Sequence, residues 1–430
     1  MRKKLGISSL LLISLTTINL WLMSKDGSQS LFANPNQSLS QLFSLLGIVL
    51  LGASLLLSTK ISFFEWVFGG QDEVIKIHRI VGSIAFVFIV NHPLLLAVQY
   101  LPKFKTALLY LTPNVDLAYN LGIFALYVMI VSFVFMAFIR LPYHIWKRSH
   151  QLLGISFILG SAHALLISSD ISRYLPLKLW IGEWIGIGIL SFIYTALLYK
   201  HVGPKYAYEI VGVERILDIV NIIMKPLGKK LPFLPGQYAY ISLTKSTVHN
   251  EIHPFSLSSS PHESTLRISA KIVGDWTLTL PSIKIGDRVN LLGPYGKFGQ
   301  LNLKPNNQLV LIGGGIGITP FLSVIRHAAV TQTQQPMACF YCYGNPEDGV
   351  FASELNTLKE QLGHNRIFSW CSKLQGRITV AKIKELLGSL ENVSIVLCGP
   401  PPMMENLKLQ FVENGVPEKR ILYEQFDFLS

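Results

Sequence analysis

Charged residues are scarce in this chain: Asp, Glu, Lys and Arg make up 14% of its 430 residues, well below the quarter that is usual in soluble proteins. The shortage is confined to the first half. From Gly6 to about Tyr199 long apolar runs alternate with short polar breaks, whereas the sequence after Lys200 has an ordinary globular composition. The pattern excludes a purely soluble protein and predicts two architectures that meet near Gly203-Pro204, where a Gly-Pro pair ends the last helix.

Cysteine is also rare, and all four cysteines (Cys339, Cys342, Cys371 and Cys398) lie in the second half. Cys339 and Cys342 form a C-x-x-C string inside an apolar run typical of a buried strand, where residues three apart point to opposite faces. No second C-x-x-C completes a zinc site. The chain also lacks a basic tract interleaved with aromatic residues, so nucleic acid is not an expected partner.

Six apolar segments are long enough to cross a bilayer at about 1.5 Å per residue. They run approximately over 6–23, 40–59, 79–101, 117–139, 148–169 and 179–199. The first has the basic start of a secretory signal but no clear cleavage site, so we expect it to be retained. Basic residues cluster on the side that holds the N-terminus and the second half, which favours a multi-pass plasma-membrane protein with both termini in the cytoplasm. The net charge of +12 suits anionic lipid head groups.

Two of these segments carry two histidines each: His78 and His92 in the third, His150 and His163 in the fifth. Ionisable side chains inside a membrane are costly and are functional candidates by default. Both segments run outward from the cytoplasm, so His78 and His150 share one depth and His92 and His163 the other. Each pair can supply two imidazoles to one iron porphyrin, and the two sites lie about 20 Å apart along the helix axis. The alternative is that the four histidines lie by accident near helix ends or carbonyl groups.

The two spacings differ in their helical geometry. Fourteen residues return to within about 40° of the same helix face, but thirteen leave a gap of roughly 140°, so His150 and His163 cannot face alike on a straight, regular helix. Gly154 and Gly160 between them would permit a kink or a π-bulge. Helix tilt or a sideways offset of the haem are the other ways to absorb the gap.

From about Lys205 to Gln300 short alternating strands are separated by Gly and Pro turns, which predicts a small antiparallel barrel. It contains HPFSLSS at 253–259. His253 there could meet a phosphate, Phe255 offers a ring face for stacking, and Ser256 offers a hydroxyl for a ring nitrogen. A loop with a structural proline explains the string equally well.

The rest of the chain alternates strands and helices. A strand that ends in Gly313-Gly314-Gly315-Ile316-Gly317 and continues into a helix sets bare backbone amides and a helix N-terminus against a phosphate. A second strand ends in Cys398-Gly399-Pro400 and would form the other side of a crevice at the carboxyl ends of parallel strands. The pattern predicts a nucleotide-binding α/β domain.

At this point the sequence resembles the transmembrane NADPH oxidase and ferric reductase family, over nearly its whole length. The resemblance rests on the histidine spacings, on HPFS, KIVGDWT (271–277), GGGIGITPF (313–321) and CGP (398–400), and on the terminal YEQFDF. It implies a multi-domain fold: a six-helix transmembrane bundle with two haems (1–203), an antiparallel β-barrel that binds FAD (204–300), and a Rossmann-like α/β domain that binds NAD(P)H (301–430).

The resemblance also implies roles for single residues. The isoalloxazine ring would be held by His253, Pro254, Phe255 and Ser256, and the FAD phosphates approached by Gly274, Trp276 and Thr277. The nicotinamide dinucleotide would contact Gly313, Gly314, Gly315, Gly317, Thr319 and Pro320, with Cys398, Gly399, Pro400 and Glu424 near the nicotinamide. A terminal aromatic residue covers the flavin in this family, which points to Phe426, with Phe428 second.

The stretch YGNPEDG (343–349) stands where many relatives carry a basic residue for the 2′-phosphate of NADPH, and it contains no Arg or Lys. We therefore expect weak discrimination between NADPH and NADH.

Together these features predict an enzyme that moves electrons from cytoplasmic NAD(P)H through FAD and two haem b groups, ligated by His78, His92, His150 and His163, to an acceptor outside. Oxygen, reduced to superoxide, is the favoured acceptor. A ferric or cupric chelate, or a quinone or partner protein, would use the same path, and no obligate protein partner is required by the sequence. A haem-binding membrane sensor without turnover is the non-enzymatic alternative.

Overall fold

The computed structural model describes residues 2–25, 33–101, 103–139, 141, 143–167, 169–199, 205–243, 252–274, 276–300, 308–333, 335–363 and 366–424. The chain separates into two compact units, Met1–Gly203 and Pro204–Ser430. The first unit is helical, and the second combines two β-sheets with helices.

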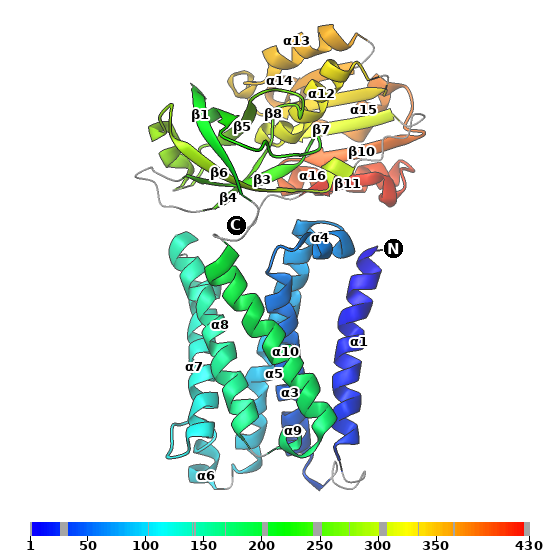
Figure 1. Ribbon diagram of the computed structural model, residues 1–430. Helices are drawn as coiled ribbons and strands as arrows, with labels where there is room; N and C mark the ends of the chain where they lie inside the picture. Colours follow the sequence, from blue (N-terminus) through cyan, green and yellow to red (C-terminus); the bar gives the residue numbers. More distant parts are fainter. Residues whose placement is uncertain are drawn as a thin grey trace. The chain divides into compact units, whose positions relative to one another are not determined.

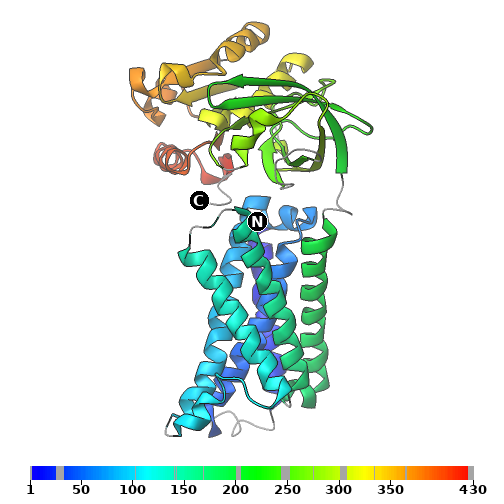
Figure 2. The ribbon, with the colours of Figure 1, turned by 90° about the vertical axis from the view of Figure 1, so that its left-hand side faces the viewer.

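Long helices run alongside one another in the first unit (Figures 1 and 2). They are α1 (Arg2–Met23), α3 (Pro35–Leu57), α5 (Gln71–Gln99), α7 (Leu117–Phe138), α8 (Tyr143–Leu166) and α10 (Leu175–Ile193), the last extended by a π-helical turn, Tyr194–Leu198. The short helices α4 (Ser62–Phe68), α6 (Phe104–Leu108) and α9 (Asp170–Arg173) lie in the connections.

Within the described residues, five of these helices are long and apolar enough to cross a membrane: α1, α3, α5, α7, and α10 with its extension. The predicted fifth span falls on α8, which is long enough but outside this set. Its basic and polar residues, among them Lys147, Arg148, His150 and Gln151, lower the hydropathy of this helix. The expected helical, membrane-spanning first half is thus confirmed as a helical region with five candidate spans.

Small residues let the helices of this unit approach closely. A Cβ atom at Gly52 of α3 would lie 2.7 Å from the carbonyl oxygen of Trp184, and one at Gly188 of α10 would lie 3.1 Å from the Cα atom of Gly52. Glycine at such crossings is typical of helix packing in membranes, where apolar side chains gain little by leaving lipid. The core between α1, α3, α8 and α10 includes Val49, Phe157 and Ile181.

The second unit begins with a six-stranded antiparallel sheet. Its strands are β1 (Lys205–Ile216), β2 (Ile219–Pro226), β3 (Tyr238–Leu243), β4 (His253–Ser256), β5 (Leu266–Lys271) and β6 (Arg288–Tyr295), in the order β4-β3-β6-β1-β2-β5. The edge strands come together through a single bridge between Leu257 and Ile268. The sheet curves around an apolar core as an antiparallel half-barrel, which bears out the coarser part of the small antiparallel barrel that the sequence predicts.

A five-stranded parallel sheet follows. It contains β7 (Gln308–Gly314), β8 (Met337–Tyr343), β9 (Arg366–Cys371), β10 (Val393–Cys398) and β11 (Ile421–Glu424), in the order β11-β10-β7-β8-β9. Helices α12 (Thr319–Thr331) and α13 (Ala352–Leu362) pack on one face, and α15 (Val380–Leu387) and α16 (Pro401–Glu413) on the other (Figure 1). The predicted α/β domain is confirmed.

Cys339 and Cys342 lie on β8 and belong to the two different cores, one on each face of the sheet. Burial raises the pKa of both thiols, that of Cys342 to about 12. Two protonated thiols on opposite faces cannot act together, as the strand period predicts.

Charged side chains tie the half-barrel to the α/β domain. Glu354 of α13 accepts hydrogen bonds from Arg267 of β5, at 2.9 Å, and from Arg326 of α12, at 2.7 Å. The Arg326 guanidinium also reaches Glu263, at 3.2 Å. One carboxylate thus holds two guanidinium groups from different parts of this unit.

Candidate functional site

The four histidines of the helical unit lie in two pairs, each with one ring from α5 and one from α8. The ring centres of His78 and His150 are 5.9 Å apart, and those of His92 and His163 are 6.4 Å apart. These are called the inner pair and the outer pair, after the side of the membrane that the sequence predicts for each. Two imidazoles that bind one metal atom from opposite sides, each at about 2 Å, place their ring centres roughly 6 Å apart.

Each imidazole uses its Nδ1 atom for a hydrogen bond to an acceptor. The Nδ1 atom of His92 lies 3.0 Å from the carbonyl oxygen of Ser40, that of His78 lies 2.9 Å from the carbonyl oxygen of Ser54, and that of His163 lies 2.7 Å from the carbonyl oxygen of Ala118. The Nδ1 atom of His150 lies 2.9 Å from the Sδ atom of Met136.

Carbonyl oxygens and thioether sulfurs only accept hydrogen bonds, so the proton of each neutral ring is on Nδ1. The lone pair of each Nε2 atom is then available for a metal. A metal-binding histidine almost always donates its other N–H group in this way, which sets the tautomer and the orientation of the ring. The spacing and the tautomers of both pairs therefore fit bis-histidine ligation of a haem iron.

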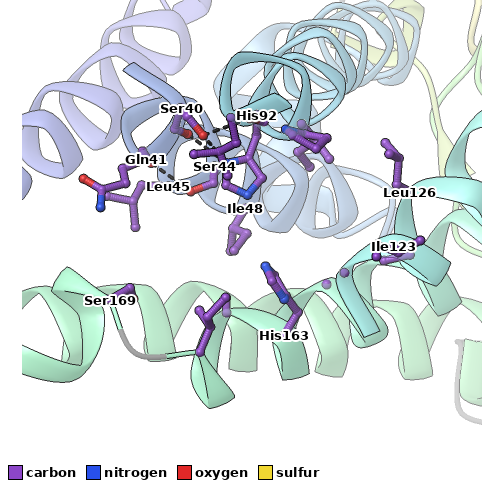
Figure 3. A pocket seen from close by; sticks show the side chains of 18 of the residues that line it. Ser40, Gln41, Ser44, Leu45, Ile48, His92, Ile123, Leu126, His163 and Ser169 are labelled. Carbon is purple, nitrogen blue, oxygen red and sulfur yellow. Dashed lines mark hydrogen bonds between the residues drawn. The ribbon is translucent and has the colours of Figure 1, made fainter. Parts of the chain in front are cut away.

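A cavity of about 260 Å³ surrounds the outer pair (Figure 3). His92 and His163 point toward each other across it from α5 and α8, between the apolar side chains Leu45 and Leu126. Gly122 of α7 makes room for the imidazole ring of His163, because a Cβ atom there would lie 2.9 Å from that ring. The apolar walls suit a porphyrin ring.

Besides the histidines, Ser40 and Ser156, further polar side chains line this cavity. They are Gln37, Gln41, Ser44, Tyr110, Tyr119, Ser169 and Asp170. Tyr110 stacks on Tyr100, with ring centres 5.5 Å apart, and desolvation raises the pKa of Tyr110 to about 12. Its hydroxyl therefore remains a hydrogen-bond donor at neutral pH.

The thirteen-residue spacing is accommodated without a π-bulge, which was one of the predicted possibilities. Helix α8 is α-helical throughout Tyr143–Leu166. Gly154 instead gives space to the Phe192 ring, whose atoms would lie 2.1 Å from a Cβ atom there. His150 and His163 thus meet their partners from different flanks of α8.

Sequence reasoning missed the two serines that orient the α5 histidines. Ser40 and Ser54 are fourteen residues apart on α3, the same spacing as His92 and His78. Each serine hydroxyl also donates back to the carbonyl oxygen of its histidine, at 2.8 Å in His92 and 3.3 Å in His78. The matched spacing was visible in the sequence, but only the packing of α3 on α5 gives it meaning.

The structure brings together three of the expected flavin residues. The Trp276 ring lies against His253 of β4, with ring centres 4.4 Å apart, and stacks on Phe255, at 5.4 Å. Ser256, the last residue of β4, is buried. Thr277 organises the preceding turn, because its Oγ1 atom accepts hydrogen bonds from the amides of Val273 and Gly274.

The glycines of GGGIGITPF allow a close crossing of backbone segments. A Cβ atom at Gly317 would lie 2.4 Å from the carbonyl oxygen of Cys398, and one at Gly313 would lie 2.7 Å from the Cα atom of Ile318. Gly315 has a φ of +56°, which L side chains seldom adopt. The turn leads into α12, where Thr319 donates its hydroxyl to the Ile316 carbonyl and Pro320 follows.

Cys398 lies between Gly313 and Glu424, because β10 pairs with β7 on one side and with β11 on the other. Burial, and then the Glu424 carboxylate, raise the pKa of the Cys398 thiol, so this thiol is not a nucleophile at neutral pH. Glu424 accepts a short hydrogen bond from the Lys297 amide of the half-barrel segment. Gly399 and Pro400 follow β10 and lead into α16.

Phe426 and Phe428 lie outside the described residues. The YGNPEDG stretch lies beside the connection after β9, because the Lys373 amide donates to the Gly344 carbonyl at 3.0 Å. The structure thus brings a basic residue next to a loop that has none of its own.

Comparison with known families identifies three successive domains. A ferric reductase like transmembrane component matches residues 43–161, an FAD-binding domain matches residues 209–298, and an oxidoreductase NAD-binding domain matches residues 311–408. The chain therefore joins a ferric reductase-like transmembrane domain to FAD- and NAD-binding domains. This order confirms the resemblance to ferric reductases and NADPH oxidases that the motifs predict.

Individual relatives match about half of the chain. The reductase component of propane 2-monooxygenase from Mycolicibacterium smegmatis is 30% identical over 224 residues, which are 49% of this chain and 64% of that protein. Flavohemoprotein A from Dictyostelium discoideum is 29% identical over 236 residues, 51% of this chain and 59% of that protein. The chain thus spans less than two thirds of the length of either relative.

Among solved structures, the FAD/NAD-binding domain of nitric oxide dioxygenase from Vibrio cholerae is 26% identical, with a TM-score of 0.45. The match covers 51% of this chain and 97% of that one.

Proposed function

We propose that this oxidoreductase is a transmembrane electron carrier that moves electrons from cytoplasmic NAD(P)H to oxygen on the other side of the membrane and forms superoxide. The first unit would be a six-helix bundle with two haem b groups, and the second an FAD-binding barrel with an NAD(P)H-binding domain. The net reaction is NAD(P)H + 2 O₂ → NAD(P)⁺ + H⁺ + 2 O₂•⁻, in which one two-electron donor reduces two one-electron acceptors.

One observation carries the proposal: the two imidazole pairs in apolar helices, each ring with its Nδ1 atom on a hydrogen-bond acceptor. Buried polar groups without a function are costly in a membrane. Two pairs of rings at two depths, each ring with its Nδ1 atom on an acceptor and its Nε2 lone pair available, are what a transmembrane chain of two haems requires. When bound, FAD accepts hydride from the nicotinamide, and haem iron passes single electrons onward.

The chain's own residues supply binding, orientation and exclusion of water. His78 and His150 would hold the inner haem, and His92 and His163 the outer haem, with Ser54 and Ser40 fixing the α5 rings. The apolar cavity walls keep water from the outer site, which strengthens electrostatic interactions there.

In the second unit, Trp276, His253 and Phe255 form an aromatic surface suited to stacking against the flavin, and Ser256 lies at its edge. The Gly313–Gly317 turn and the first turn of α12 offer backbone amides to the nucleotide phosphates. Cys398 and Glu424 would border the nicotinamide, and Phe426 would cover the flavin until the nicotinamide displaces it.

The basic residues favour a plasma-membrane location with both termini in the cytoplasm. Lipid would then be a partner of the helical unit. NAD(P)H would reach the second unit from the cytoplasm, and no obligate protein partner is proposed.

A ferric or cupric chelate is the second candidate acceptor. The match of residues 43–161 to a ferric reductase like transmembrane component favours it. The electron path inside the protein would be the same, so the two candidates differ only at the outer site.

The test is NAD(P)H oxidation by the purified protein in detergent or nanodiscs, with and without FAD. Superoxide is measured as dismutase-sensitive cytochrome c reduction, beside a ferric-chelate assay. We expect FAD-dependent oxidation, two haems per chain, and more electrons delivered to oxygen than to ferric citrate. A protein with a haem Soret band that never oxidises NADH or NADPH would instead support the non-enzymatic sensor.

A further inference from the structure

An ion pair lies at the end of the outer cavity nearest α9. The Lys25 ammonium, just after α1, makes a short contact with the Asp170 carboxylate at the start of α9. It also donates to the Oε1 atom of Gln41 on α3, at 2.7 Å, and lies 5.2 Å from the centre of the Trp21 ring. Arg173 approaches the other oxygen of Asp170 at 3.6 Å. The network joins α9 to the end of α1 and to α3, across 145 positions between Lys25 and Asp170.

Both members of the pair are removed from solvent: the Lys25 and Asp170 side chains are 10% and 9% exposed. Arg173, by contrast, is 69% exposed. A buried ion pair is weak evidence for stability, since desolvation offsets most of the attraction. Its presence beside a cavity therefore needs another explanation.

Asp170 is the one Asp, Glu, Lys or Arg among the described residues that line this cavity. Lys25 lies behind it and is not part of the lining. An acceptor inside this cavity thus faces the carboxylate directly, whereas the compensating ammonium lies outside the lining. Gln41, Tyr110 and Tyr119 add neutral polar groups to the lining of the cavity.

We propose that the Lys25–Asp170 pair determines the charge class of the acceptor that is reduced at the outer site. The inference rests on the proposed electron path and adds the acceptor's chemistry to it. The carboxylate disfavours anionic metal chelates, because like charges brought together in a cavity of low dielectric repel strongly. A small neutral acceptor such as oxygen enters without this penalty. After oxygen takes one electron, the same carboxylate repels the superoxide anion, which favours its release.

The alternative is a purely structural role, in which the pair only ties α1 to α9. The two readings differ in sign. If charge is what matters, Asp170→Asn and Lys25→Gln shift acceptor preference in opposite directions. If the pair is only a structural tie, both variants weaken the same contact and shift the preference in the same direction or not at all.

The experiment uses the full-length protein with both haems, reduced chemically with dithionite that is then removed. Reoxidation is followed at the Soret band by stopped flow with three acceptors: oxygen, the trianion ferricyanide and the trication hexaammineruthenium(III). Because NAD(P)H and FAD are not needed, this assay gives an answer even if the proposed catalytic function fails.

For Asp170→Asn we expect the ratio of ferricyanide to hexaammineruthenium rate constants to rise about fivefold or more, as for loss of one charge near a docking site. For Lys25→Gln the ratio should fall by a similar factor. The double variant should return close to the wild-type ratio, and the oxygen rate should change less than about twofold in all three. Lys178→Gln, an exposed cation on α10, is the matched control and should leave the ratio unchanged.

A second readout does not depend on turnover. The midpoint potential of the outer haem should rise in Asp170→Asn and fall in Lys25→Gln, with the haem content still two per chain. The double variant guards against misfolding, because it removes both buried charges together. Equal shifts of the acceptor ratio in both single variants, or shifts no larger than that of Lys178→Gln, would overturn the proposal.

Discussion

In the helical unit the candidate functional groups are side chains, and in the second unit they are mainly backbone. His92 and His163 meet across an apolar cavity, and each would bring one nitrogen to a metal. The Gly313–Gly317 turn, by contrast, contributes amide groups and close approach, because it lacks large side chains. A polar side chain in an apolar helix is conspicuous and can be removed singly, whereas a backbone site is changed only by altering the shape of the chain.

The comparison predicts the largest single effect for the replacement of a haem-binding histidine in the helical unit. His163→Ala should remove the outer haem completely and leave the inner one, so that haem content falls from two per chain to one. Pyridine haemochrome content per polypeptide measures this. Asn91→Ala is the matched control, because Asn91 precedes His92 and, within the described part of the chain, its side chain bonds to its own helix at Val87. A haem content of two in both His92→Ala and His163→Ala would show that the pairing is wrong.

In the second unit the largest effect is expected from added volume. Gly317→Ala places a methyl group 2.4 Å from the Cys398 carbonyl oxygen, so β10 and the turn must separate. We expect a loss of about 1–3 kcal/mol in the free energy of unfolding and a clear loss of NADH affinity, with haem content unchanged. Thermal melting and NADH titration measure the two effects.

Gly228→Ala is the control for that variant, since a Cβ atom at Gly228 meets nothing within 4 Å. Equal effects of the two alanines would contradict the account of the turn as a site of close approach.

The flavin residues test whether side chains matter in the second unit as well. Trp276→Ala removes the ring that packs on His253 and Phe255, and should weaken FAD binding by about tenfold, for a loss of ~1.4 kcal/mol. Ser256→Ala should keep most of the FAD affinity and slow flavin reduction by NADH. Flavin fluorescence gives the affinity and stopped-flow bleaching gives the rate. If neither variant changes either quantity, both residues lie outside the site.

The smallest expected effect concerns pH. His327 of α12 stacks on His262, with ring centres 5.1 Å apart. Desolvation, and then His262, lower the pKa of His327 below its ordinary value of 6.5. Above pH 6.5 the ring is neutral in both states and contributes nothing. As the pH falls below that value, the unfolded chain takes up the proton more readily, so the folded state loses stability.

His327→Gln should therefore reduce the drop in melting temperature between pH 7.5 and pH 5.5 by about 1–2 °C. The measurement is differential scanning fluorimetry of the detergent-solubilised protein. An identical drop in the variant and the wild type would mean that His327 does not contribute to the acid sensitivity. Haem content should be the same in both proteins, because α12 belongs to the second unit.

Much of the fold and of the candidate site could be predicted from local signals. Apolar runs of membrane length located the helices, and the alternation of strands and helices located the α/β domain. Hydrophobic periodicity is a local property of the chain, so it can be recognised without knowledge of the tertiary structure. The His78, His92, His150 and His163 set was visible for the same reason, since a polar residue stands out where the surroundings are uniformly apolar.

Features that depend on packing were less accessible. The half-barrel leaves its edges joined by one bridge, and its closure depends on long-range pairing that no single strand encodes. How helix α8 accommodates the thirteen-residue spacing of its histidines was likewise open. A glycine at position 154 is compatible both with a π-bulge and with close packing of the Phe192 ring. Ser40 and Ser54 gained a role only when α3 was packed against α5.

The sequence by itself determined which residues could be ligands, since that depends on residue type and on depth along each helix. Tertiary structure decided which nitrogen of each imidazole carries the proton, because the acceptors of the Nδ1 atoms come from other helices. It also decided that Asp170 lines the outer cavity with Lys25 behind it, a contact between residues 145 positions apart. Charge pairing over such a separation leaves no local pattern, because the free energy that selects it is gained only when the segments have folded together.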